Sequence, residues 1–236
     1  MSDQFATELA SAILQHRPLP KFCDELTLEG AYALQHQVTS AIAPEGAAGI
    51  KAGVTASPVQ SYFGIDHPLI ASLYPKSKHN SGDKLSFIEG RGIECEVAVL
   101  MDENGRPKAI APAIEFVFVK FSEASDMSAA NLVASNLGAD AFLVGDFQPW
   151  KDGAFDELTA VLSRNGEEIG RADMNDAIGG PGPATEWMFN EAKARGFRVG
   201  ADTLIMTGAC GQAMPGEIGN YVMEIDRLGS VSFVIQ

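Results

Sequence analysis

The chain has 236 residues, of which 46% are hydrophobic and 20% charged, with 24 glycines, 12 prolines and no biased tract. This composition is typical of a folded domain and excludes collagen-like, coiled-coil and disordered classes. Counting 17 lysines and arginines against 31 aspartates and glutamates gives a net charge of −14, which repels phosphate backbones and anionic lipid surfaces. We therefore expect neither nucleic acid nor a membrane as a partner.

The first 48 residues predict a helical region that packs on the remainder of the chain. Residues 4–16 carry apolar side chains at helical spacing, and Pro18 follows them. A second helix is expected to start at Thr27, an N-cap residue, and to bury one apolar stripe up to Ile42. The predicted organisation is an N-terminal helical region, 1–48, and a catalytic domain, 49–236.

From Gly49 onward the sequence indicates short strands, because turn residues recur about every eight to twelve residues between β-branched runs. Asn104-Gly105 and Asn165-Gly166 are hairpin turn signals. One further helix is expected at 184–195. The predicted fold class is α+β and predominantly β, with strands at 93–101, 112–121, 140–145, 156–164, 203–208, 221–226 and 230–235.

Two features bear on the compartment of the protein. The sequence shows no basic start followed by an apolar run and no stretch of about 20 apolar residues, so we expect a cytoplasmic protein. The three cysteines, Cys23, Cys95 and Cys210, are widely spaced and odd in number. They predict neither a disulfide framework nor a zinc site, and we expect reduced core residues.

Three glutamates lie in apolar strands, where carboxylates are not expected. Glu94 and Glu96 point to one face of their strand because side chains alternate, and Glu115 lies in the next apolar strand. Three converging buried carboxylates repel one another unless they are protonated or a cation neutralises them. An oxygen-only ligand set favours Mg²⁺, Mn²⁺ or Ca²⁺. The alternative is a solvated edge strand carrying Glu94 and Glu96, with Glu115 paired to a lysine or arginine.

Lys51 lies between small residues in Gly49-Ile-Lys-Ala-Gly53, which allows a ligand to approach the backbone closely. Near a metal, a lysine can bind a substrate carboxylate or keto oxygen, or act as an acid. The alternative is a surface lysine in a glycine-rich turn.

Several short motifs resemble, in order and over nearly the whole chain, those of one enzyme family. They are LTLEGAYALQ (26–35), GIKAGVT (49–55), ECE (94–96), PAIE (112–115), VASN (133–136), GGPGPATEWM (179–188) and TG (207–208). The family is the 2-keto-4-pentenoate hydratase and 4-oxalocrotonate decarboxylase branch of the fumarylacetoacetate hydrolase superfamily.

The resemblance implies a mixed β-roll with flanking helices and a helical N-terminal region. It also implies a Mg²⁺ or Mn²⁺ ion held by Glu94, Glu96 and Glu115, with Lys51 as a catalytic residue. Asn136 and Thr207 lie in matching motifs and are candidate substrate-binding residues. A homo-oligomer is expected on the same basis.

The activity that the resemblance implies is metal-dependent hydration of a 2-keto-4-pentenoate-like 2-oxo acid through a metal-stabilised enolate. Two alternatives remain open: decarboxylation or tautomerisation of a 2-oxo diacid, and a catalytically silent homologue that binds a keto acid or serves an assembly role. The second remains because the sequence departs from the family pattern, with Leu69 where an acid is usual and Ser135 where the family has aspartate. Asp66 or His67 could replace the missing acid, unless that loop is solvent-exposed.

Overall fold

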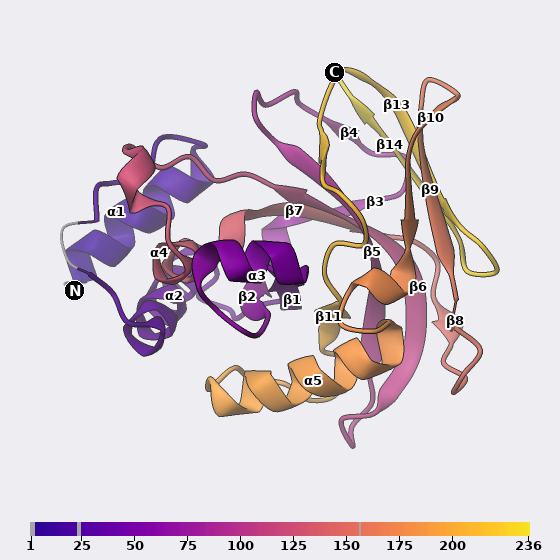
Figure 1. Ribbon diagram of the computed structural model, residues 1–236, viewed down its shortest axis with the longest axis horizontal. Helices are drawn as coiled ribbons and strands as arrows, with labels where there is room; N and C mark the ends of the chain where they lie inside the picture. The colour runs from indigo at the N-terminus through magenta and orange to yellow at the C-terminus, as the bar shows by residue number, and fades with distance from the viewer. Residues whose placement is uncertain (1–2, 23–24, 156) are drawn as a thin grey trace.

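The computed structural model describes residues 3–22, 25–155 and 157–236. In Figure 1, helices α1, α2 and α4 lie at the left, α5 runs along the bottom, and the strands, which form two sheets, occupy the centre and right. The helices are α1 (Asp3–Leu14), α2 (Leu28–Ile42), α3 (Ser57–Phe63), α4 (Ala129–Ala134) and α5 (Pro181–Ala194), with the 3-10 helices η1 (Pro75–Ser77), η2 (Ala124–Asp126), η3 (Asn136–Gly138) and η4 (Met174–Asp176). The strands are β1 (Gly49–Gly53), β2 (Leu69–Leu73), β3 (Lys78–Asn80), β4 (Lys84–Leu85), β5 (Gly92–Met101), β6 (Pro107–Val117), β7 (Ala139–Val144), β8 (Gln148–Pro149), β9 (Thr159–Arg164), β10 (Glu167–Asp173), β11 (Leu204–Met206), β12 (Met214–Pro215), β13 (Gly219–Ile225) and β14 (Gly229–Ile235).

The larger sheet is mixed and strongly curved. Its order is β2-β1-β11-β5-β6-β7-β3, with β12 beside β5 and β8 beside β6. Strands β1 and β11 run parallel, whereas the long β5–β6 hairpin at its centre is antiparallel. Strands β2 and β7 are also in contact, although they are not neighbours in the order. The sheet therefore curls into a roll with an inner and an outer face.

The smaller sheet packs on the outer face of the roll and completes the core. Its order is β10-β9-β13-β14-β4, and β13 alternates buried and exposed residues as a half-covered strand must. Phe233 on β14 stacks on Tyr221 at 4.7 Å and meets Phe116 on β6 edge-on at 5.1 Å between ring centroids. These aromatic contacts join the two sheets.

The N-terminal helices pack against the roll. Thr27 caps α2 by accepting a hydrogen bond from the backbone N–H of Gly30, as its residue type predicts. The stripe that runs to Ile42 is buried. Further along, the side chain of Gln35 donates to the carbonyl oxygens of Ile70 and Val133, so α2 is bonded to both β2 and α4.

A cluster of polar and charged side chains joins the segment after α1 to β5 and β7. Asp140 on β7 forms an ion pair at 2.7 Å with Arg91, which immediately precedes β5, and it lies 2.6 Å from the Nε2 atom of His16. The Arg91 side chain is only 8% exposed, so its buried guanidinium group needs the carboxylate of Asp140 as a partner. The start of β5 and the start of β7 are thereby tied to the N-terminal region.

The predicted fold class is confirmed, and most predicted elements are present with shifted ends. The strand expected at 112–121 spans Pro107–Val117. It begins soon after the Asn104-Gly105 turn, and its pairing with β5 and β7 ends at Val117. Helices α3 and α4 and strands β1, β2, β3, β4, β8, β10 and β12 were not predicted. Strands β3, β4, β8 and β12 have only two or three residues, and the five residues of β1 include two glycines. No helix among the described residues is long and apolar enough to cross a membrane.

Candidate metal centre

The roll brings together the three glutamates that the sequence singles out. Glu94 and Glu96 lie on β5, and Glu115 on β6 is paired directly with Glu94. One carboxylate oxygen from each residue lies within 4.8 Å of the others. The edge-strand alternative for Glu94 and Glu96 is excluded, because β5 is central in the sheet and Glu96 is fully buried.

Lys51 lies on the same inner face. It is paired with Met206 on β11, which is paired with Ala98 on β5, and Ala98 shares a face with Glu96 because side chains alternate. The Nζ atom of Lys51 is 3.0 Å from Glu115 Oε1. Lys51 is 1% exposed, so the alternative of a surface lysine is wrong.

The three carboxyl groups outnumber the one ammonium group beside them, and burial, together with this excess of negative charge, shifts their pKa values. Burial, and then repulsion from Glu115, raises the pKa of Glu94 to about 7. Burial likewise raises the pKa values of Glu96 and Glu115. Glu96 Oε1 and Glu115 Oε2 are buried and have no hydrogen-bond partner among the described residues. Unpartnered buried carboxylate oxygens are what a divalent cation would coordinate, so the donor set fits Mg²⁺ or Mn²⁺.

Lys51 supplies one positive charge, because its surroundings favour the protonated ammonium group. Burial lowers its pKa, but the negative potentials of Glu115, Glu94 and Glu96 outweigh burial, and the net pKa is raised. Its ammonium group also donates to the carbonyl oxygen of Leu137 at 3.1 Å. An ammonium group has three protons, and two of them are directed at these partners. One proton of the ammonium group remains beyond these two.

A glycine that the spacing arguments did not single out orients one carboxylate. The backbone N–H of Gly208 donates to Glu96 Oε2 at 2.9 Å. Gly208 has a φ of +100°, and a Cβ atom there would lie 2.5 Å from the Cγ2 of Thr55. The position therefore requires glycine. The only signal in the sequence is the TG motif at 207–208.

The two candidate substrate-binding residues lie beside the cluster, but both side chains bond to backbone. The amide of Asn136 bonds to the backbone N–H and carbonyl of Ser72, each at 2.8 Å. The hydroxyl of Thr207 donates to the carbonyl of Val97 at 3.3 Å. Asn136 is 0% and Thr207 1% exposed. Their contact with a substrate stays a prediction.

The loop considered as a source of the missing acid is exposed. Asp66 bonds to His67 at 2.8 Å, and its side chain is 98% exposed. The hydrogen bond from His67 lowers the pKa of Asp66. Leu69 is fully buried at the start of β2, where it is paired with Gly53.

Cys95 and Cys210 lie in surroundings that disfavour the thiolate. Burial raises the pKa of Cys95 to about 12 and that of Cys210 well above its ordinary range. Both are free, as expected, and Cys23 lies outside the described residues.

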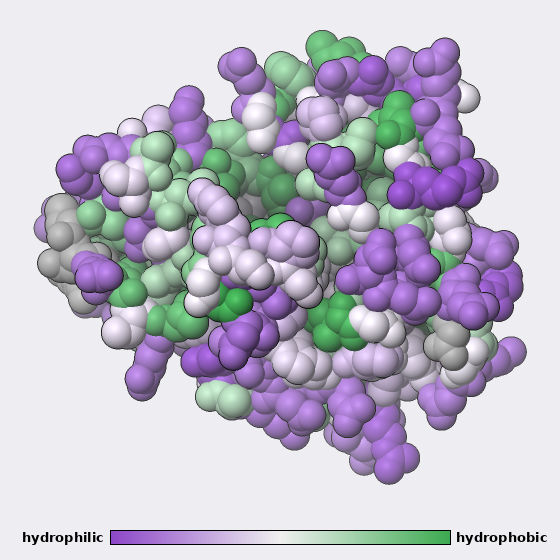
Figure 2. Space-filling view, viewed as in Figure 1, coloured by the Kyte–Doolittle hydropathy of each residue, from purple (hydrophilic) through white to green (hydrophobic). Residues whose placement is uncertain are grey.

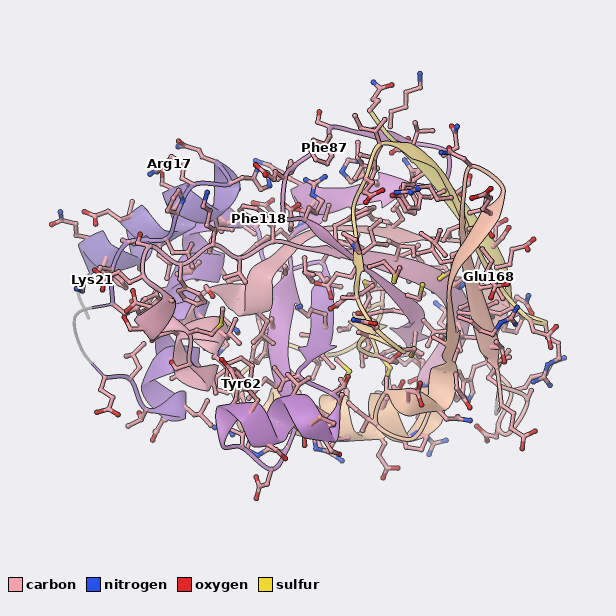
Figure 3. All side chains as sticks on the ribbon, turned by 45° about the horizontal axis from the view of Figure 1, so that its top comes forward. Arg17, Lys21, Tyr62, Phe87, Phe118 and Glu168 are labelled. Carbon is pink, nitrogen blue, oxygen red and sulfur yellow. The ribbon has the colours of Figure 1, made fainter. Side chains whose placement is uncertain are left out.

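Helix α3 is the next element after β1 and is largely exposed, although Phe63 at its end packs against the core. None of its residues is buried, and Tyr62 on its outer side is 76% exposed (Figure 3). Figure 2 shows a paler, less hydrophilic surface over α3 than along the purple lower and right-hand rims. The chain between Lys51 and β2 thus presents an open, weakly polar surface.

Comparison with known proteins places these features in context. No family model matches the chain. It is 26% identical over 234 residues to a 2-keto-4-pentenoate hydratase of Burkholderia vietnamiensis, covering 91% of this chain and 88% of the relative. A 4-oxalocrotonate decarboxylase from Pseudomonas putida G7, solved with magnesium and adipate, superposes with a TM-score of 0.89 at 21% identity, covering 100% of this chain and 99% of that one. A fumarylpyruvate hydrolase from Pseudomonas aeruginosa, solved with Mn²⁺ and pyruvate, gives a TM-score of 0.60 at 13% identity over 79% of this chain and 88% of that one. The resemblance indicated by the sequence motifs is confirmed.

Proposed function

We propose that this protein, a homologue of the 2-keto-4-pentenoate hydratases, is a divalent-metal-dependent lyase that hydrates a small 2-oxo acid of the 2-hydroxydienoate type. The observation that carries the proposal is the buried cluster of three carboxylates beside a charged lysine on the inner face of the roll. Glu94, Glu96 and Glu115 would hold Mg²⁺ or Mn²⁺. The bound cation would supply a Lewis acid that neutralises negative charge on the substrate oxygens.

The residues of the chain supply binding, orientation and a fixed positive charge. Lys51 keeps its proton because three carboxylates surround it, and its remaining N–H can donate to the carboxylate or keto oxygen of the substrate. The Gly208 N–H fixes one carboxylate, so the site needs little reorganisation when negative charge develops on the substrate.

The site can be tested before the substrate is known. Thermal unfolding of metal-stripped protein is measured with and without Mg²⁺ or Mn²⁺, and then with oxalate or pyruvate as mimics of the 2-oxo acid head group. A metal-dependent rise in Tm that oxalate enlarges supports a chelating site. Absence of any response contradicts the metal assignment of the three glutamates.

The reaction is tested separately by following the absorbance of a 2-hydroxydienoate with Mg²⁺ present. Metal-dependent loss of absorbance without release of CO₂ supports the hydratase. If the metal and oxalate bind but no dienoate is consumed, the protein is the silent keto-acid-binding homologue instead.

One observation favours a second candidate, decarboxylation of a 2-oxo diacid. The family motif has an acid at the position that the buried Leu69 occupies in this chain, so the resemblance supplies no base for water there. Loss of CO₂ requires no activated water. Stoichiometric release of CO₂ from a 2-oxo diacid would establish this reaction.

Three further expectations belong to the same proposal. We propose a homo-oligomer, because the resemblance to the hydratase and decarboxylase family implies one. Light scattering in solution tests it. We also propose cytoplasmic location and the division at residue 48, which cell fractionation and expression of 49–236 alone would test.

A further inference from the structure

The backbone beside Lys51 makes an unusual turn. Asn136, Leu137 and Gly138 have φ values of +57°, +51° and +66°, so three consecutive residues are left-handed. Glycine adopts this conformation freely and asparagine tolerates it, but for leucine it costs about 1–2 kcal/mol. Such a turn persists only where surrounding contacts determine it.

One side chain fastens the turn to β2. The Asn136 amide accepts from the Ser72 N–H and donates to the Ser72 carbonyl, both at 2.8 Å, and is completely buried. Ser72 is paired with Ile50 on β1, the residue before Lys51. The amide therefore fastens the turn to the strand next to the one that carries the lysine.

The turn presents a backbone carbonyl to the lysine. Leu137 is the middle residue, and its carbonyl accepts from Lys51 Nζ at 3.1 Å. The Leu137 side chain packs over Gly53, where a Cβ atom would lie 3.1 Å from its Cδ1. The ammonium group is thus held from two directions, by this carbonyl and by Glu115.

We propose that Asn136 is a positioning residue for Lys51: its amide clamps the 136–138 turn to β2, so that the Leu137 carbonyl holds the ammonium group beside Glu115. This gives Asn136 a different role from contact with the substrate. The inference rests on the proposed function only in that Lys51 acts on the substrate, whereas the clamp itself is a property of the protein alone.

The chain offers a matched control in Gln35. Its amide is also fully buried and also bonds to β2, through the Ile70 carbonyl, but its other hydrogen bond goes to the Val133 carbonyl on α4 and neither goes to the 136–138 turn. Gln35→Ala therefore removes a comparable buried amide without releasing the turn.

The experiment compares Asn136→Ala with Gln35→Ala in three measurements: Tm, the split between kcat and KM for the dienoate, and the NMR signal of the Lys51 ammonium in ¹⁵N-lysine-labelled protein. The signal is assigned by its loss in Lys51→Met. We expect Asn136→Ala to lower kcat about tenfold or more and to broaden or shift the ammonium signal. Gln35→Ala should lower Tm similarly while kcat and the signal stay unchanged.

The proposal is overturned if both variants lose kcat in proportion to Tm, or if Asn136→Ala keeps the Lys51 signal of the native protein. Should Asn136→Ala fail to fold, Asn136→Gly replaces it, because glycine adopts the positive φ without strain and lacks only the amide. The NMR measurement needs no substrate. An inactive native protein would therefore contradict the proposed function, whereas the ammonium signal would still decide the role of Asn136.

Discussion

Glu94 and Glu115 lie directly opposite each other on the central antiparallel strands β5 and β6. Like charges in cross-strand pairs destabilise a sheet, and burial makes the repulsion harder to screen. The pairing therefore lowers the stability of the metal-free protein, and a bound cation would reduce the repulsion. The predictions below depend on this relationship.

The first prediction concerns metal binding. Glu115→Gln keeps the size of the side chain and an acceptor for Lys51 but removes one negative ligand. We expect the variant to fold and to lose the rise in Tm that Mg²⁺ or Mn²⁺ produces in the native protein. The exposed strand residue Glu224 provides the control Glu224→Gln, which should keep the metal response. An unchanged response in Glu115→Gln would remove Glu115 from the site.

The second prediction concerns pH. The folded-state pKa of Glu94, about 7, is raised above the ordinary value of 4.5, so metal-free folded protein binds the extra proton between these two values. Its stabilising contribution is complete below about pH 4.5 and is lost as pH rises through about 7. The metal needs ionised carboxylates.

Metal-free protein should therefore have a higher Tm at about pH 6 than at about pH 8, while the rise in Tm on adding Mg²⁺ should be larger at the higher pH. Thermal scans in EDTA and in Mg²⁺ across this range measure both. A metal response that does not change with pH would contradict the raised pKa.

The third prediction concerns Lys51. Lys51→Met removes the charge that neutralises Glu115 and leaves that carboxylate buried without its partner. Breaking a buried ion pair costs about 3–5 kcal/mol, so metal-free Tm should fall. Added Mg²⁺ should restore more stability than it adds to the native protein, and turnover should fall at least about 100-fold. An equal metal response in both proteins would show that the lysine and the metal are not linked.

The fourth prediction concerns the glycine at the end of β11. Gly208→Ala places a Cβ atom against Thr55 at a positive φ, so it should cost about 1–3 kcal/mol and turn the N–H away from Glu96. We expect weaker Mg²⁺ binding in titrations. Gly196→Ala is the control, since that glycine also has a positive φ but nothing within 4 Å of a Cβ atom. It should lower Tm slightly and leave the affinity for Mg²⁺ unchanged.

The sequence predicted the carboxylates because alternation within a strand fixes which side chains share a face. That local rule placed Glu94 and Glu96 together, and apolar flanks marked Glu115 as buried. It could not give the pairing of Glu115 with Glu94, which depends on the register set by the Asn104-Gly105 turn. The resemblance to a known family supplied that step.

Sequence patterns could not predict which backbone groups bond to Lys51 and Glu96. Leu137 contributes a backbone carbonyl, and Gly208 contributes a backbone N–H to Glu96; backbone groups carry no residue signature. Strand β1 was missed for a related reason, since its stability comes from neighbours distant in sequence, β2 and β11, rather than from its own residues.

Asp140, whose side chain is 12% exposed, lies between two side chains from different parts of the chain, Arg91 and His16. Arg91 lies three residues before Glu94, and β7, which carries Asp140, is bonded to the strand that carries Glu115. Removing the first helix and the segment after it would take away the His16 contact and leave Arg91 as the ion-pair partner of Asp140. The N-terminal segment is therefore connected, through Asp140, to both strands that carry the candidate metal ligands.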